Sequence, residues 1–185
     1  NTLQELIRNA RSSRLTHASG VGTSSHIAAD YLFRILAKLD AVHVPFKGGA
    51  PAMAMLLANQ LDVYIATVPT IVPMVQAGRI RVIAVSSARR SPAFPEVPTI
   101  AESGLPGFDT TSWFCIVGPA GLPKAIVARL NTEIVNILNN AEVKERLTAA
   151  GVNVESTTPE GLRSFVRAEI QKMRKSVKFS GASVD

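Results

Sequence analysis

The sequence predicts an α/β fold with a largely parallel sheet. Strand-like runs at 15–19, 42–46 and 61–66 are each followed by a stretch with helical features. Strands that alternate with helices in this way usually pair in parallel through right-handed crossovers. The hydrophobic content of 46% and the charged content of 18% are ordinary for a well-buried globular chain. We therefore expect one compact unit or two small lobes.

The first half of the chain is expected to contain helices at 2–11, 27–39, 51–58 and 69–77, and a further strand at 79–86. Residues 2–5 form a capping box that starts the first helix. Apolar residues recur at helical spacing through 27–39, whereas Pro73 restricts or kinks the helix at 69–77 before Gly78 ends it. The apolar run at 80–85 is typical of a central parallel strand.

The second half is expected to be mostly helical. A proline-rich extended connection at 91–98 breaks the alternation of strands and helices. The predicted elements beyond it are helices at 99–104, 123–139, 142–150 and 159–178, and strands at 111–117 and 152–155. Because two strands and a few helices make a poor core, we expect them to complete a sheet whose other strands are absent from this chain. Cys115, inside an apolar run, is expected in the core.

The stretch 18–26, Ala-Ser-Gly-Val-Gly-Thr-Ser-Ser-His, has the chemistry of an anion-binding turn. Its glycines allow a tight turn, its hydroxyls can cap the following helix, and that helix begins with unpaired N–H groups and a positive dipole end. A carboxylate, a phosphate or nothing at all fits this pattern. The alternative is a plain strand-to-helix turn, in which His26 is a capping or packing residue.

The next strand ends in Phe46-Lys47-Gly48-Gly49, at the edge where open α/β sheets bind ligands. In one interpretation Lys47 faces an anion and Gly48 allows its close approach. In the other, Lys47 is an exposed lysine in an ordinary turn.

Enzyme, metal and nucleic-acid functions find little support. The sequence lacks a Gly-x-Ser-x-Gly elbow, a Walker motif and paired carboxylates, and Ser24, Ser25 and His26 are too close in sequence to face one another on a helix. His17 and His43 are isolated in predicted strands, so we expect no metal and no cofactor. The net charge is +6, but its cations are scattered, so nucleic acid is not an expected partner. One basic stripe is read as a solvated helix face or, alternatively, a docking surface for an acidic partner: Arg163, Arg167, Lys172, Arg174 and Lys175.

A set of short motifs in this order resembles one known family: 3–6, 18–26, 43–49, 60–62, 77–81, 97–104, Trp113 and 118–123. Together they are similar to the tripartite tricarboxylate transporter receptors, the Bug periplasmic solute-binding proteins. The resemblance implies a type II periplasmic-binding fold with two lobes. It further implies that 1–107 forms the complete second lobe, and that 108–185 holds the crossover and the C-terminal helices of an incomplete first lobe.

The same resemblance implies that a signal peptide and the early elements of the first lobe should precede Asn1, so that the chain is N-terminally truncated. A periplasmic location follows by analogy, although the chain itself shows no signal-peptide pattern and no membrane-spanning apolar run.

The resemblance also assigns site residues. The turn at 20–26 would receive a ligand carboxylate through hydroxyl and backbone N–H donors of Thr23, Ser24 and Ser25. Ala66 departs from the family pattern of an acidic or amide residue, which leaves Thr67 as the polar candidate there. Trp113 would shield the cleft at the crossover or, alternatively, lie in the core. The full predicted set is Ser19, Gly22, Thr23, Ser24, Ser25, His26, Phe46, Lys47, Gly48, Thr67 and Trp113.

The expected function is capture of a small carboxylate solute for the membrane subunits of a tripartite transporter. Exposed edges of an incomplete sheet would also invite a homo-oligomer. One alternative is the effector-sensing domain of a transcriptional regulator, although no helix-turn-helix is visible. Another is a truncated chain that binds little because half of the cleft is lost.

Overall fold

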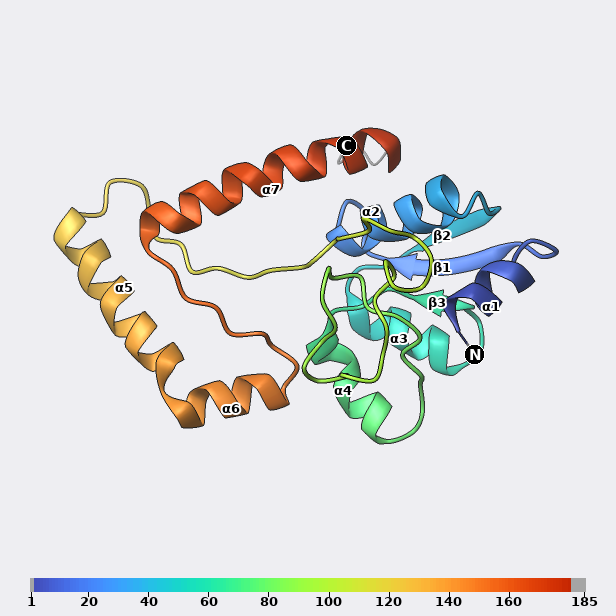
Figure 1. Ribbon diagram of the computed structural model, residues 1–185, viewed down its shortest axis with the longest axis horizontal. Coiled ribbons are helices and arrows are strands. Elements are labelled where there is room, and N and C mark those ends of the chain that lie inside the picture. Colours follow the sequence, from blue (N-terminus) through green and yellow to red (C-terminus); the bar gives the residue numbers. More distant parts are fainter. Residues whose placement is uncertain (1, 181–185) are drawn as a thin grey trace.

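The computed structural model describes residues 2–180. The part of the chain before residue 111 folds into one layered body around a small sheet, and the later part runs beside it as long extended segments and helices (Figure 1). No helix within residues 2–180 is both long enough and apolar enough to cross a bilayer.

The sheet has the strand order β2-β1-β3, and every pairing is parallel. The central strand β1 spans Leu15–Ser19, β2 spans Ala41–Pro45 and β3 is limited to Val63–Tyr64. Helices α1 (Leu3–Asn9), α2 (Ser24–Ala29), α3 (Gly49–Leu57) and α4 (Val68–Gln76) alternate with these strands. The predicted α/β fold with a parallel sheet is therefore confirmed.

The long helix predicted at 27–39 changes its geometry halfway. It begins as α2 and continues without a break into the π-helix η1, Asp30–Leu36. Its last turns are closed by wide hydrogen bonds, Ala37 N–H to Leu32 O at 2.9 Å and Leu39 N–H to Phe33 O at 2.9 Å. π-Helical turns are uncommon and often mark functional sites. Apolar spacing predicted the buried face but could not predict this wider turn.

The main core lies under this helical segment. Leu3, Leu15, Leu32, Phe33 and Phe108 are almost fully buried there and join α1, β1, η1 and the loop before residue 110. A second cluster packs α4 onto the proline-rich connection through Val72, Val85, Phe94 and Val97. The connection at 91–98 is thus anchored to the first body by apolar side chains.

The strand predicted at 79–86 does not form. Only Val85 makes a bridge, to Thr99, and the backbone of 80–84 makes no ladder within the described part of the chain. An apolar run predicts burial, but a strand also requires a neighbouring strand that accepts and donates its backbone hydrogen bonds. The two-residue strand β3 is too short to be that neighbour. The helix predicted at 99–104 is replaced by turns, although its capping box forms between Thr99 and Glu102.

The three helices predicted after residue 120 are confirmed as α5 (Lys124–Asn139), α6 (Ala141–Ala149) and α7 (Pro159–Ser180). The strands predicted at 111–117 and 152–155 are irregular extended chain. The expected burial of Cys115 is wrong, because this thiol is exposed together with its neighbours Phe114 and Ile116. In Figure 1 this crossover segment reaches α5 without a strand beside it, which explains both errors.

Replacing Phe33 with alanine tests the main core. This side chain is 1% exposed, so Phe33→Ala should lower the free energy of unfolding by about 3–5 kcal/mol through lost burial and a residual cavity. Urea unfolding followed by circular dichroism measures the change. The matched control is Phe114→Ala, because Phe114 is 82% exposed and its loss should cost less than about 0.5 kcal/mol. Equal effects of the two substitutions would contradict this core.

Candidate functional site

Most of the predicted site residues lie at the carboxyl ends of the parallel strands. The turn after β1 leads into α2, Phe46, Lys47 and Gly48 lead from β2 into α3, and Thr67 leads from β3 into α4. The first two groups are joined directly, because the Phe46 N–H donates to the Ser19 carbonyl at 3.1 Å. Three helix N-termini therefore follow strand ends at one edge of the sheet (Figure 1).

The turn after β1 is held by its own polar groups. Thr23 is the N-cap of α2, and its hydroxyl donates to the Gly20 carbonyl at 2.7 Å while accepting from the His26 N–H at 3.3 Å. Gly22 has a φ of 73°, a conformation that side chains disfavour. The Thr23 hydroxyl, predicted to bind a ligand, is thus engaged in holding the turn.

The first N–H groups of α2 remain available. Within the described residues, the backbone N–H groups of Ser24 and Ser25 donate no hydrogen bond, and neither does the Ser25 hydroxyl. The Ser24 hydroxyl pairs with that of Ser112 at 2.7 Å, so the crossover segment touches the turn. Sequence reasoning missed Ser112, because nothing local links residues so far apart in sequence.

The end of β2 provides a second helix N-terminus. Gly48 is the N-cap of α3, has a φ of 101° and offers no side chain to cap it, and Lys47 beside it is exposed. The Tyr64 hydroxyl lies so near that a Cβ on Gly49 would stand 2.9 Å from it. Burial raises the pKa of Tyr64, so its phenol stays a neutral donor. Tyr64, the last residue of β3, was also missed.

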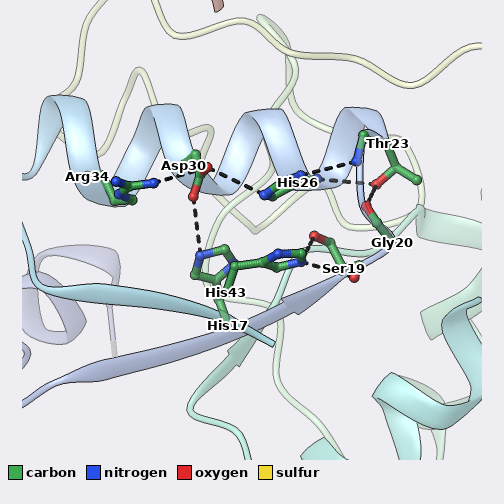
Figure 2. A network of polar contacts seen from close by, with 9 residues as sticks. His17, Ser19, Gly20, Thr23, His26, Asp30, Arg34 and His43 are labelled. Atoms are coloured by element: carbon green, nitrogen blue, oxygen red, sulfur yellow. Dashed lines mark hydrogen bonds and ion pairs between the residues drawn. The ribbon is translucent and has the colours of Figure 1, made fainter. Parts of the chain in front are cut away.

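Three histidines form a stacked cluster directly behind the turn. His17 on β1 stacks on His43 of β2 with ring centroids 5.3 Å apart, and His43 stacks on His26 of α2 at 3.9 Å. Figure 2 shows the imidazole rings gathered beneath the helix that carries Asp30. The expectation that His17 and His43 are isolated is wrong, since the β1/β2 register makes them Cα partners. Each histidine is the third residue of its observed strand, but the predicted bounds of 42–46 shifted the second strand by one residue.

Asp30 is the acidic member of this cluster and is 3% exposed. Its carboxylate lies 3.6 Å from His17 Nε2, 3.5 Å from His26 Nε2 and 3.5 Å from the Arg34 guanidinium. Within residues 2–180, no hydrogen-bond partner reaches either ring nitrogen of His17 or the Asp30 Oδ1. Burial lowers the pKa of His17 to about 4 and outweighs the attraction of Asp30, so the ring is neutral at neutral pH.

The cluster is hydrogen-bonded to the turn. His26 Nδ1 accepts from the Gly22 N–H at 3.2 Å, and His43 Nε2 lies 2.8 Å from the Ser19 hydroxyl and 3.1 Å from the Ser19 carbonyl. Burial, followed by the nearby His43, lowers the pKa of His26. Ser19 and His26 thus support the turn from behind. No group of side chains within residues 2–180 is arranged to hold a metal ion.

The remaining predicted site residues lie around this centre. Trp113 packs edge-on against Phe165 of α7, with centroids 5.2 Å apart, and its indole N–H donates to Glu169 at 3.3 Å. It stands beside Ser112 and is 38% exposed, so it is not a core residue. Thr67 makes only local hydrogen bonds among the described residues. Its hydroxyl donates to the Thr70 hydroxyl at 3.5 Å, and its carbonyl accepts from that hydroxyl at 2.7 Å.

The basic stripe on α7 is partly paired. Lys172 contacts Asp109 at 2.6 Å and Glu169 at 3.4 Å, and Arg163 contacts Glu160 at 3.3 Å. Arg167 and Arg174 are exposed, and the Lys175 side chain lies outside the described residues. This agrees with the solvated-face interpretation more than with a continuous docking surface.

A groove of about 550 Å³ lies elsewhere, lined by residues 2–4, 80–83, 94 and 96–98 among others. It includes none of the predicted site residues. The free donors at strand ends, and not this groove, therefore define the candidate site.

Helix N-termini that follow strand ends at the carboxyl edge of a parallel sheet are the arrangement found in many ligand-binding α/β proteins. The chain belongs to the tripartite tricarboxylate transporter family of receptors, whose profile matches residues 1–181. This is a family of binding proteins and not of enzymes, and a solved relative, BugD, is a periplasmic binding protein. The resemblance read from the sequence motifs is confirmed.

Individual relatives support this assignment. The chain is 36% identical over 179 residues to a protein encoded between tcbD and tcbE in Pseudomonas sp. strain P51, covering 95% of this chain and 53% of that protein. It is 31% identical over 166 residues to BugT of Bordetella pertussis, covering 90% and 51%. The chain thus spans about half the length of these curated relatives.

Solved structures show the same fold. R. palustris Rpa4515 with adipate superposes with a TM-score of 0.92 at 32% identity, covering 98% of this chain and 62% of that one. MatC of Rhodopseudomonas palustris with bound malate gives a TM-score of 0.82 at 31% identity, covering 96% and 62%.

The buried histidine predicts a pH dependence of folding stability. Unfolded His17 takes up a proton below about pH 6.5, but the folded ring does so only near a pKa of about 4. The unfolded state therefore binds more protons between these values, and the stabilisation present above about pH 6.5 is lost as the pH falls toward about 4. The contribution of His17 to the slope is at most about 1.4 kcal/mol per pH unit.

The variant His17→Phe isolates this contribution, because the new ring can still pack between Phe33 and His43. Urea unfolding between about pH 7 and about pH 5 should give a flatter profile for the variant than for the wild type. Identical slopes would show that His17 titrates alike in both states.

Proposed function

We propose that this chain is the ligand-binding part of a periplasmic receptor that captures a small dicarboxylate and delivers it to the membrane subunits of a tripartite tricarboxylate transporter. One observation carries the proposal: the unoccupied backbone N–H groups of Ser24 and Ser25 at the start of α2. They face the carboxyl edge of a parallel sheet, where α/β proteins bind their ligands.

Each donor has a defined part in this proposal. One carboxylate accepts from the Ser24 and Ser25 N–H groups and from the Ser25 hydroxyl, assisted by the positive end of the helix dipole. Lys47 and the uncapped N-terminus of α3 at Gly48 supply further positive potential beside it. Charge-assisted hydrogen bonds of this kind are stronger than neutral ones, which suits an anionic solute.

The dicarboxylate class is supported by the relatives. Adipate and malate are bound by two solved proteins that share 32% and 31% identity with this chain. The two molecules differ in length and in hydroxyl content, but both carry a carboxylate at each end. A turn that binds one carboxylate through backbone groups serves either of them.

We further propose that residues 1–107 form one lobe, the second of the family fold, and that 108–185 hold the crossover and part of the first lobe. The crossover is strongly apolar yet exposed, with Phe114 82%, Ile116 71% and Val117 78% exposed, as expected of a segment that pairs with a further strand. The Ser112–Ser24 contact brings it to the turn. Closure of the lobes would then trap the solute, stabilised by contacts made only in the closed state.

Titration with adipate and malate tests the function. Isothermal calorimetry should detect one saturable site for at least one of these dicarboxylates, and the chain's one tryptophan, beside Ser112, should change its fluorescence on binding. Uncharged diamide analogues are the control and should not bind. Absence of binding by either acid would support the alternative of a chain with little specific affinity.

A proline at position 24 tests the backbone donors separately from the side chains. Ser24 is the first residue of α2, where proline is favoured, and Thr23 before it already has the extended conformation that proline requires, with φ −74° and ψ 162°. Ser24→Pro therefore removes one N–H donor without breaking the helix. We expect about a tenfold to hundredfold loss of dicarboxylate affinity, the scale of a charge-assisted hydrogen bond.

The matched control is Ser24→Ala, which removes the hydroxyl and its bond to Ser112 but keeps the N–H group. Its affinity should stay within about threefold of the wild type, since about 0.6 kcal/mol is the scale of an exposed neutral hydrogen bond. If alanine and proline weaken binding equally, the hydroxyl and not the backbone holds the carboxylate.

A further inference from the structure

His26 lies between the anion-binding turn and the buried carboxylate of Asp30. Its Nδ1 accepts the Gly22 N–H at 3.2 Å, and its Nε2 stands 3.5 Å from Asp30 Oδ2. A ring nitrogen that accepts an N–H must carry a lone pair, so the neutral ring holds its proton on Nε2. The second proton of an imidazolium would have to go to Nδ1, directly against the Gly22 N–H.

We propose that neutral His26 is a positioning residue of the anion-binding turn, and that protonation of Nδ1 displaces the Gly22 N–H and weakens carboxylate binding. This inference rests on the proposed function, because it concerns the regulation of the same site. The residue concerned, His26, would not contact the ligand itself, because it is 8% exposed and lies behind the turn.

The geometry of the turn explains the coupling. Gly22 is in the left-handed region, and its N–H bond to His26 ties the top of the turn to the helix that follows it. The next residue, Thr23, caps α2 and so directs the free N–H groups of Ser24 and Ser25. Two donors facing each other at Gly22 would move the cap and misalign both ligand donors.

The charges around His26 favour the neutral ring. On β2, His43 stacks against it at 3.9 Å, and on β1, His17 competes for the same Asp30 carboxylate. Arg34 on η1 also pairs with Asp30 at 3.5 Å. Asp30 thus already has a cationic partner, and the burial of the ring and its contact with His43 oppose a further positive charge.

Helix α7 also packs against α2, and two of its charged residues, Lys172 and Glu169, are paired away from His26. Lys172 pairs with Asp109 at 2.6 Å, and Glu169 accepts from the Trp113 indole and contacts Lys172. The pKa of His26 is lowered, first by burial and then by His43, which agrees with these neighbouring groups.

The opposite effect, attraction of the anion by an imidazolium, is weaker in this geometry. The nitrogen that would gain the proton is covered by the Gly22 N–H, so its new N–H cannot reach a ligand unless the turn opens. The sign is therefore fixed: acidification should weaken binding, and binding should not take up a proton at His26.

The test compares the pH dependence of adipate affinity in the wild type and in His26→Asn. Asparagine can place its amide oxygen near the position of Nδ1, so it keeps an acceptor for the Gly22 N–H but does not titrate. Between about pH 8 and the pH at which His26 is protonated, the wild type should lose about tenfold in affinity relative to this variant. Protonation of adipate itself affects both proteins equally and cancels.

The variant His26→Phe keeps a stacking ring but has no acceptor, and it should bind weakly at every pH. Wild-type affinity that rises relative to His26→Asn on acidification, or equal pH profiles of the two, would overturn the proposal. Thermal unfolding of each variant shows whether it is folded under the assay conditions.

A separate measurement distinguishes this inference from the proposed function. In ¹⁵N NMR spectra without ligand, the Gly22 amide should shift with the same midpoint as the His26 ring, and this transition should vanish in His26→Asn. A Gly22 amide that does not follow His26 overturns the role of His26 whether or not a dicarboxylate binds. Absence of binding at every pH, with the amide following His26, counts against the proposed function instead.

Discussion

The parallel pairing of β1 with β2 is the constraint on which the rest of the site depends. Its register places Ser19 opposite Pro45, so both strands end at the same level and both succeeding helices start at one edge. The same register places His17 opposite His43 and builds the stacked cluster under α2. A shift by one residue would turn every side chain to the other face of the sheet and separate these rings.

Asp30 links the helix to the paired strands, because its carboxylate lies 3.6 Å from His17 Nε2 on β1. A carboxylate that is 3% exposed loses much of its hydration; its cationic partner here is Arg34 at 3.5 Å, and two neutral histidine rings lie 3.5–3.6 Å away. Asp30 is also the residue at which the α-helix becomes a π-helix. The start of the π-helix is linked to the preceding turn through side chains, because Asp30 contacts His26 and His26 accepts from the Gly22 N–H.

Sequence reasoning succeeded where local chemistry decides the outcome. The run at 15–19 became a strand with those bounds, the capping box expected at residues 2–5 formed at the start of α1, and a hydroxyl of the 18–26 stretch, that of Thr23, caps α2. It failed where the structure of a segment depends on a neighbour that is distant in sequence. Residues 80–84 and 111–117 have the apolar character of strands, but in the described part of the chain no strand pairs with their backbone, and Cys115 is exposed for the same reason. The stacking of His17 on His43 and the contact of Ser112 with the turn were missed, because strand register and crossover contacts cannot be read from local sequence spacing.

Because the Thr23 hydroxyl holds the turn, the ligand recognition that we propose rests mainly on the peptide backbone. Every residue except proline supplies a backbone N–H, so the two backbone donors proposed at positions 24 and 25 do not depend on the side chains there, whereas the Ser25 hydroxyl does. Receptors of this type can therefore diverge at those positions and keep the same anion-binding turn. The feature that must be preserved is the backbone conformation of the turn. The glycines of the turn and the histidines behind it maintain that conformation.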